Sequence, residues 1–161
     1  MDKETLLKEI EKAFPLRPLP NIIAGDVTPY EDEYSYVETY FKDKKWNSFT
    51  FKELYNNYKG PQEACLTFMS PTAFHYYLPG FICIVLNEYD DADLLVDTTL
   101  YNLFTDDDSR STIFDKFTKD QIQVVVNFIQ YMSETHTEDF FEDEINTALE
   151  LWKKRLTHAP R

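Results

Sequence analysis

A long stretch without any charged side chain, residues 64–87, constrains this chain more than any other feature of the sequence. About 20 consecutive apolar residues can cross a bilayer, so a membrane span has to be considered first. Pro71 and Pro79 interrupt the stretch, polar side chains such as His75 lie within it, and neither flank carries the Lys/Arg cluster that anchors a span. The stretch is therefore predicted to form the buried centre of a fold, and no membrane association is expected.

Local signals divide this stretch into two predicted helices. Ser70 followed by Pro71 is typical of an N-cap with proline at the first helical position, where the missing N–H is tolerated. Pro79 should end or kink this helix, because proline lacks a backbone donor and clashes with the preceding turn. Gly80 would loosen the joint, and a second helix over residues 81–89 would leave at an angle. The expected centre is a Pro-kinked pair of apolar helices.

The segment LTFMSPTAFHYYLP, residues 66–79, also resembles the signature of an uncharacterised bacterial family that is catalogued as a domain of unknown function. That signature is close to L-x-F-(L/M)-(S/T)-P-x-A-F-x-Y-Y-L-P, and weaker similarities include Phe14-Pro15 and the spaced Gln121, Val125 and Phe128. The resemblance implies a common helical fold and supplies no activity. The signature positions expected to be structurally important are Trp46, Phe68, Pro71, Phe74, Tyr76, Tyr77 and Pro79.

The rest of the chain shows the patterns of amphipathic helices, and a length of 161 residues predicts one domain. Apolar residues recur at helical spacing in residues 3–14, and acidic residues open a predicted helix at 31–41. Capping boxes that begin at Thr50 and Thr118 open two more helices. Further helices are predicted at residues 93–104 and 138–156. The expected fold is all-α, a single compact multi-helix bundle over residues 1–161.

Burial and redox state can also be predicted. Both cysteines, Cys65 and Cys83, lie in the uncharged stretch, which suits reduced buried thiols in a cytoplasm better than a disulfide. The first residues lack the apolar region of a secretory signal, so a cytoplasmic location is expected. The side chains predicted to lie in the core include Phe74, Tyr77, Ile82, Val125 and Phe128.

Signatures of catalysis and metal binding are missing from the sequence. It contains no G-x-S-x-G, P-loop or dinucleotide-binding pattern, no C-x-x-C, and no pair of histidines at ligand spacing. A D-x-D sequence at 91–93 is similar to the start of an EF-hand loop, but Leu95 and Val96 stand where an acid and a glycine would be needed. No cofactor and no metal are expected. An enzyme of unrecognised class with a site near His75 and Tyr77 stays an alternative.

The charge pattern carries the functional prediction. The formal net charge is −13, and residues 60–109 and 120–152 contain no Lys or Arg. Direct nucleic-acid binding is disfavoured, because phosphate contacts need a basic surface. A basic protein partner is favoured, while acidity for solubility alone is the competing explanation.

We interpret the chain as a cytoplasmic interaction protein that binds and masks a basic protein surface, for example an immunity protein against a nuclease-like toxin. A structural subunit of a larger assembly is a further alternative. The predicted contact residues form the densest acidic run of the sequence: Glu88, Asp90, Asp91, Asp93, Asp97, Asp106, Asp107 and Asp108.

Overall fold

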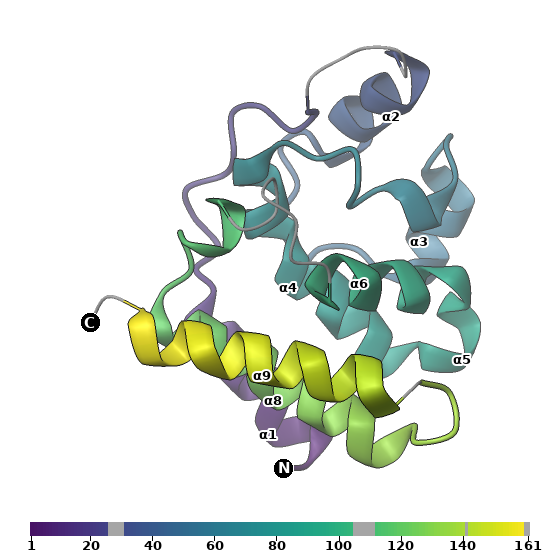
Figure 1. The fold of residues 1–161 in the computed structure, drawn as a ribbon. Coiled ribbons are helices and arrows are strands. Elements are labelled where there is room, and N and C mark those ends of the chain that lie inside the picture. Colours follow the sequence, from purple (N-terminus) through teal and green to yellow (C-terminus); the bar gives the residue numbers. More distant parts are fainter. Residues whose placement is uncertain (26–30, 105–111, 141, 160–161) are drawn as a thin grey trace. The chain divides into compact units, whose positions relative to one another are not determined.

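The computed structural model describes residues 1–25, 31–104, 112–140 and 142–159. Within these residues the regular elements are helices, and extended backbone pairs only in an isolated bridge between Ala24 and Met69. The all-α prediction is confirmed. Figure 1 shows α1 (Lys3–Ala13), α2 (Glu31–Phe41), α3 (Phe51–Asn57), the 3-10 helix η1 (Gln62–Ala64), α4 (Pro71–Asn87), α5 (Tyr89–Ala92), α6 (Leu94–Phe104), α8 (Lys119–Thr135) and α9 (Glu142–His158).

The helices pack as two compact units. Unit 1 comprises Met1–Pro15 and Leu103–Arg161, and unit 2 comprises Leu16–Asn102. Both ends of the chain therefore belong to unit 1. A single domain would unfold as one cooperative unit. The packing within each unit does not test this cooperativity, so the single domain stays a prediction.

Unit 1 is built on α1, α8 and α9, with α8 in contact with both of the others (Figure 1). The capping box predicted at Thr118 is present: its hydroxyl accepts from the Gln121 N–H at 3.3 Å, and the Gln121 side-chain oxygen accepts from the Thr118 N–H at 3.1 Å. The side-chain amide of Gln121 also donates to the Ala13 carbonyl at 3.2 Å. One buried side chain thus opens α8 and closes α1.

Aromatic rings fill the core of unit 1. Trp152 on α9 is fully buried, its indole N–H donates to the Leu103 carbonyl at 2.8 Å, and its ring centroid lies 4.6 Å from that of Phe114. The guanidinium of Arg155 lies 5.2 Å from the centroid of the Phe114 ring and forms an ion pair with Asp115 at 3.2 Å. These contacts hold the second half of α9 in place.

Unit 2 contains the central apolar helix, α4. It runs without interruption from Pro71 to Asn87, with Ser70 as its N-cap as predicted, and Pro79 lies inside it. The predicted pair of helices meeting at Pro79 is therefore wrong, because the chain forms one helix there. Most side chains between residues 73 and 86 are buried. Burial of so much apolar surface outweighs the roughly 3 kcal/mol that a proline costs in a helix interior.

Gly80 has a packing role rather than the predicted hinge role. A Cβ atom at this position would collide with the backbone carbonyl oxygen of Trp46 and would lie 2.9 Å from Cζ of Phe49. Both of these aromatic residues are buried. The loop over residues 46–49 therefore lies directly against the backbone of α4, and only a residue without a side chain leaves it room.

The predicted core is confirmed. Phe74, Tyr77, Ile82, Val125 and Phe128 are all 0% exposed. The two cysteines are free thiols, as predicted, although only Cys65 is fully buried and Cys83 is half-buried.

Several helix boundaries differ from the sequence prediction by a few residues. For example, α4 ends at Asn87 instead of residue 89, and α9 covers Glu142–His158 instead of residues 138–156. Residues 89–92 form the separate helix α5. Such shifts of a few residues reflect weak signals at helix ends, where several backbone geometries compete.

Candidate functional site

The predicted acidic residues that the structure describes lie on consecutive short helices of unit 2. Asp90 and Asp91 belong to α5, Asp93 directly follows it, and Asp97 lies in the first turn of α6. All four side chains are exposed. The sequence prediction thus identified carboxylates that are available to solvent and close together along the chain.

Glu88 differs from the other members of the acidic run. Its carboxylate accepts a hydrogen bond from the backbone N–H of Phe51 at 2.9 Å, at the start of α3. Anions are stabilised at a helix N-terminus, so Glu88 has a folding role within unit 2. Asp106, Asp107 and Asp108 lie outside the described residues.

Asp93 also ends α5 with an unusual backbone geometry. Its φ of 40° and ψ of −118° lie outside the regions that residues with a side chain usually adopt. Substitution of Asp93 would therefore disturb the backbone as well as the charge, and Asp93 is a poor position for testing electrostatics.

Two large apolar side chains beside these carboxylates were not predicted to be exposed. Leu94 is 54% exposed and Tyr101 is 68% exposed. Positions 94, 97 and 101 recur at intervals of three and four, so these two side chains and Asp97 lie on the same side of α6. That spacing could have revealed them in the sequence, had the apolar positions of the helix been sorted by face. We call the exposed set Asp90, Asp91, Asp93, Leu94, Asp97 and Tyr101 the acidic surface.

The signature tyrosines tie loops of unit 2 to α4. The Tyr76 hydroxyl donates to the Leu16 carbonyl at 2.8 Å. The Tyr77 hydroxyl lies 2.7 Å from the Phe41 carbonyl and 2.8 Å from the Lys44 carbonyl, so it closes the end of α2. The paired tyrosines therefore hold two connections that are distant from them in sequence.

The start of the signature holds a third connection. The Ser70 hydroxyl donates to the Ile22 carbonyl at 2.7 Å and accepts from the backbone N–H of Ala73, while the Ser70 N–H donates to the Ile23 carbonyl at 2.7 Å. The carboxylate of Glu38 on α2 accepts from the backbone N–H groups of Ile23 and Ala24 on the same segment. Ser70 and Glu38 together fix residues 22–24.

The remaining signature residues also have structural environments. Phe68 packs edge-on against Tyr34 with ring centroids 5.2 Å apart, and Pro71 occupies the first turn of α4. Trp46 is buried against the Gly80 backbone, and Phe74 and Pro79 are buried within α4. These signature residues thus take part in the fold of unit 2.

These contacts bear on the alternative of an active site near His75 and Tyr77. Tyr77 is fully buried, and burial, followed by the neighbouring Tyr76, raises the pKa of its hydroxyl above the ordinary value. A hydroxyl that is buried, protonated and held between two carbonyl oxygens has no route to a substrate. The catalytic alternative therefore has no support from Tyr77.

Cys65 is expected to react slowly for a similar reason. It is fully buried, and burial raises the pKa of its thiol and also the pKa of the nearby Tyr58 hydroxyl. The thiolate is the reactive form of cysteine, so a thiol kept protonated by burial reacts slowly.

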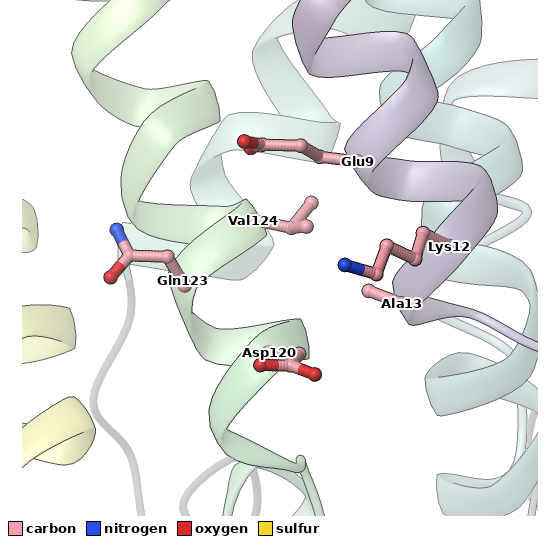
Figure 2. A pocket seen from close by; sticks show the side chains of 6 residues that line it. All are labelled: Glu9, Lys12, Ala13, Asp120, Gln123 and Val124. Carbon is pink, nitrogen blue, oxygen red and sulfur yellow. The ribbon is translucent and has the colours of Figure 1, made fainter.

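A groove between α1 and α8 in unit 1 has no counterpart in the sequence predictions. Its volume is about 140 Å³, and it is lined by Glu9, Lys12, Ala13, Asp120, Gln123 and Val124. Figure 2 shows Glu9 and Lys12 extending from α1 toward α8, with Asp120 on the first turn of α8 facing them. The residues come from segments more than a hundred positions apart, so no local pattern could have shown it.

Neither a metal centre nor a membrane span emerges from the described part of the chain. Those residues include no group of three or more His, Cys, Asp or Glu side chains arranged to hold a metal ion. Across the same residues, no helix combines the length and apolarity that a bilayer crossing requires.

These features define an all-helical protein whose signature residues act as structural ties and which carries a run of four exposed carboxylates along α5 and the start of α6. The chain belongs to a family of unknown function, DUF6714, whose sequence model matches residues 2–156. The resemblance to a family of unknown function is thereby confirmed, and it covers nearly the whole chain. Searches of curated proteins and of solved structures found no match.

Proposed function

We propose that this protein binds and masks a basic surface of a partner protein, and that the acidic surface makes the contact. The observation that carries the proposal is the exposure of Leu94 and Tyr101 on the same side of α6 as the exposed Asp97, a few residues after the exposed Asp90, Asp91 and Asp93. Recognition surfaces commonly place a few apolar or aromatic anchors inside a polar rim, and the anchors supply most of the affinity. The carboxylates would supply selectivity for a cationic partner.

The charge distribution supports this assignment. Residues 60–109 contain no Lys or Arg, so the segment that includes the acidic surface carries no balancing cation of its own. A surface of one sign accelerates encounter with a partner of the opposite sign and rejects partners of like charge. A small acidic chain with these properties suits an inhibitor of a basic enzyme. An immunity protein that neutralises a nuclease-like toxin in a bacterial cytoplasm is the specific form that we propose.

The decisive experiment separates local charge from total charge. Asp90→Lys, Asp91→Lys and Asp97→Lys are combined in one variant, and Asp93 is left intact because of its backbone geometry. The control combines Glu11→Lys, Glu138→Lys and Glu150→Lys, three exposed acids in unit 1 that change the net charge equally. A partner captured by the wild-type protein is identified and purified, and association rates are measured with both variants.

The acidic-surface variant should associate at least roughly tenfold more slowly, within the range known for electrostatic steering. The control variant should retain most of the wild-type rate. Wild-type association should slow as salt rises, because exposed charges are screened beyond about 8 Å at physiological ionic strength. Equal rates for the two triple variants would show that the acidic surface serves solubility only.

The apolar anchors allow a second test with a matched control. Tyr101→Ser removes one anchor, and Tyr55→Ser removes a tyrosine of nearly equal exposure, 67%, on α3. Tyr101→Ser should raise the dissociation rate of the complex, whereas Tyr55→Ser should not. A structural subunit of a larger assembly predicts a different outcome, in which the complex persists at high salt and survives the reversal of Asp90, Asp91 and Asp97.

A further inference from the structure

The groove between α1 and α8 is separate from the acidic surface and combines charged and apolar side chains. The groove is lined by the carboxylates of Glu9 and Asp120, the ammonium group of Lys12, and the apolar side chains of Ala13 and Val124. We infer that the groove is a binding subsite for the guanidinium group of an arginine side chain. The inference concerns unit 1 alone and does not depend on the function proposed for the acidic surface.

A chain of hydrogen bonds orients one of the two carboxylates. The Gln123 side-chain amide donates to the Asn127 side-chain oxygen at 2.9 Å, and the Asn127 amide donates to Oε2 of Glu9 at 2.8 Å. A carboxylate can accept further hydrogen bonds, so Glu9 keeps capacity for a ligand while its position is already fixed. Fixing a charged group before the ligand arrives lowers the entropic cost of binding.

The size and the second carboxylate also fit this ligand. A buried cavity of about 150 Å³ in another protein holds benzene, so a volume of about 140 Å³ accommodates the smaller guanidinium head with its adjoining methylene. The planar guanidinium presents five donors, so a head bound at one carboxylate keeps donors for further acceptors of the groove. The methylene groups of arginine would lie on the apolar side chains of Ala13 and Val124.

Substitution of Lys12 can reveal whether the ligand of the groove is positively or negatively charged. Its side chain is exposed, and Figure 2 shows its ammonium group reaching into the space between the helices. A cationic ligand must displace this ammonium group or be repelled by it, whereas an anionic or zwitterionic ligand would pair with it. Neutralising Lys12 should therefore strengthen binding of a cation and weaken binding of an anion.

The experiment is a titration of the ¹⁵N-labelled full chain with N-acetyl-arginine amide, followed by NMR chemical shifts. The amide signals of Ala13 and Val124 should move in a saturable manner. The uncharged isostere N-acetyl-citrulline amide should bind more weakly. Glu9→Gln keeps the hydrogen-bond acceptor for Asn127 and should weaken binding by roughly two- to fivefold, the range for a partly exposed ion pair. Lys12→Gln should strengthen binding by a similar factor.

A matched control is Glu11→Gln, an exposed acid on α1 that does not line the groove. It should leave the dissociation constant nearly unchanged, and circular dichroism should show the same unfolding midpoint for every variant used. The assignment is overturned if the two amides do not shift or if citrulline binds as well as arginine. Weaker binding of N-acetyl-arginine amide by Lys12→Gln would also overturn it, because removing a neighbouring positive charge should strengthen the binding of a cation. In that case the chain from Gln123 to Glu9 serves only to align the two helices.

Discussion

Unit 1 and unit 2 are both helical, but they are stabilised in different ways. Unit 1 packs an 11-residue helix and two 17-residue helices, with Trp152 buried on α9, and its polar contacts include side-chain bonds between helices such as Asn127 to Glu9. Unit 2 has one long helix, α4, accompanied by shorter helices and loops. Its loops are held by side chains such as Tyr77 and Glu38 that bind backbone groups.

The difference shows where each unit is vulnerable. Long helices that share an apolar face are stabilised by many small packing contributions, so the loss of one polar contact should have a modest effect. A loop that is held by one buried hydroxyl, or that packs closely on one glycine, depends on a single residue. We therefore expect polar and glycine substitutions to damage unit 2 more than unit 1, while truncation of a buried aromatic residue should damage either.

The largest effect is expected from truncation of a buried ring. Phe74→Ala in unit 2 and Phe128→Ala in unit 1 should each cost about 3–5 kcal/mol in the free energy of unfolding, because both rings are 0% exposed. Incorporation of 5-fluorotryptophan gives one ¹⁹F probe in each unit, at Trp46 and Trp152. If the chain is a single domain, the two probes should report the same urea midpoint as each other within each protein. That shared midpoint should be lower in both variants than in the wild type.

Two separate transitions would show that the units fold independently and would contradict the single-domain prediction. A loss below about 1 kcal/mol in Phe74→Ala would contradict its place in the core. The signals are assigned with Trp46→Phe and Trp152→Phe.

A second test concerns the contact between α4 and the loop at residues 46–49. Gly80→Ala should cost about 1–3 kcal/mol, the usual range for overpacking, because the added methyl group meets a backbone oxygen that cannot rotate away. Alanine favours a helix over glycine by about 1 kcal/mol, so a hinge without close packing would be stabilised by the same change. Urea unfolding therefore distinguishes the two cases. A lower free energy of unfolding in Gly80→Ala indicates close packing, and a higher one indicates a hinge. Gly25 is a useful comparison, since a Cβ there would lie 3.2 Å from Cε1 of Tyr34, a side chain that can move.

A third test concerns the paired tyrosines. Tyr77→Phe should cost about 1–2 kcal/mol, because it removes the one hydroxyl donor that serves the buried carbonyl of Phe41 and the part-buried carbonyl of Lys44. Tyr76→Phe should cost less, since Tyr76 is half-buried and the Leu16 carbonyl can exchange its partner for water. Thermal unfolding of the two variants measures the difference. Equal small losses would show that the hydroxyl of Tyr77 is not needed to hold the end of α2.

The same contrast explains which features could be predicted from the sequence. The capping boxes at Thr50 and Thr118 join residues three positions apart, and the structure confirms both. The bond from Tyr76 to Leu16 joins residues 60 positions apart, and the choice of partner depends on the complete fold. The lack of charge in residues 64–87 identified Phe74, Tyr77 and Ile82 as core, because a long uncharged stretch is buried whichever neighbour covers it.

Pro79 and the groove illustrate the limits of local signals. The preference of proline for a helix end was overridden by the burial of α4, a tertiary effect. The exposed carboxylates on α5 and α6 followed from composition, whereas the exposure of Leu94 and Tyr101 required knowing which side of α6 faces the core. The groove needed the packing of α1 on α8, which brings Glu9 next to Asn127.

The smallest expected effect is a pH dependence at the first turn of unit 1. The Asp2 carboxylate caps α1 by accepting from the Thr5 N–H at 2.8 Å and from the Thr5 hydroxyl at 3.0 Å. These bonds hold the pKa of Asp2 below its ordinary value. Because the pKa is lowered in the folded state, the cap contributes stability above the unfolded pKa of about 3.9, and the contribution is lost as the pH falls through the folded value. Carbon-13 Cα shifts of residues 3–6 should lose helical character over this range in the wild type. Asp2→Asn keeps a capping oxygen without a titrating group, so its shifts should stay constant there. Parallel changes in both proteins would show that other carboxylates cause the transition and that the Asp2 cap does not.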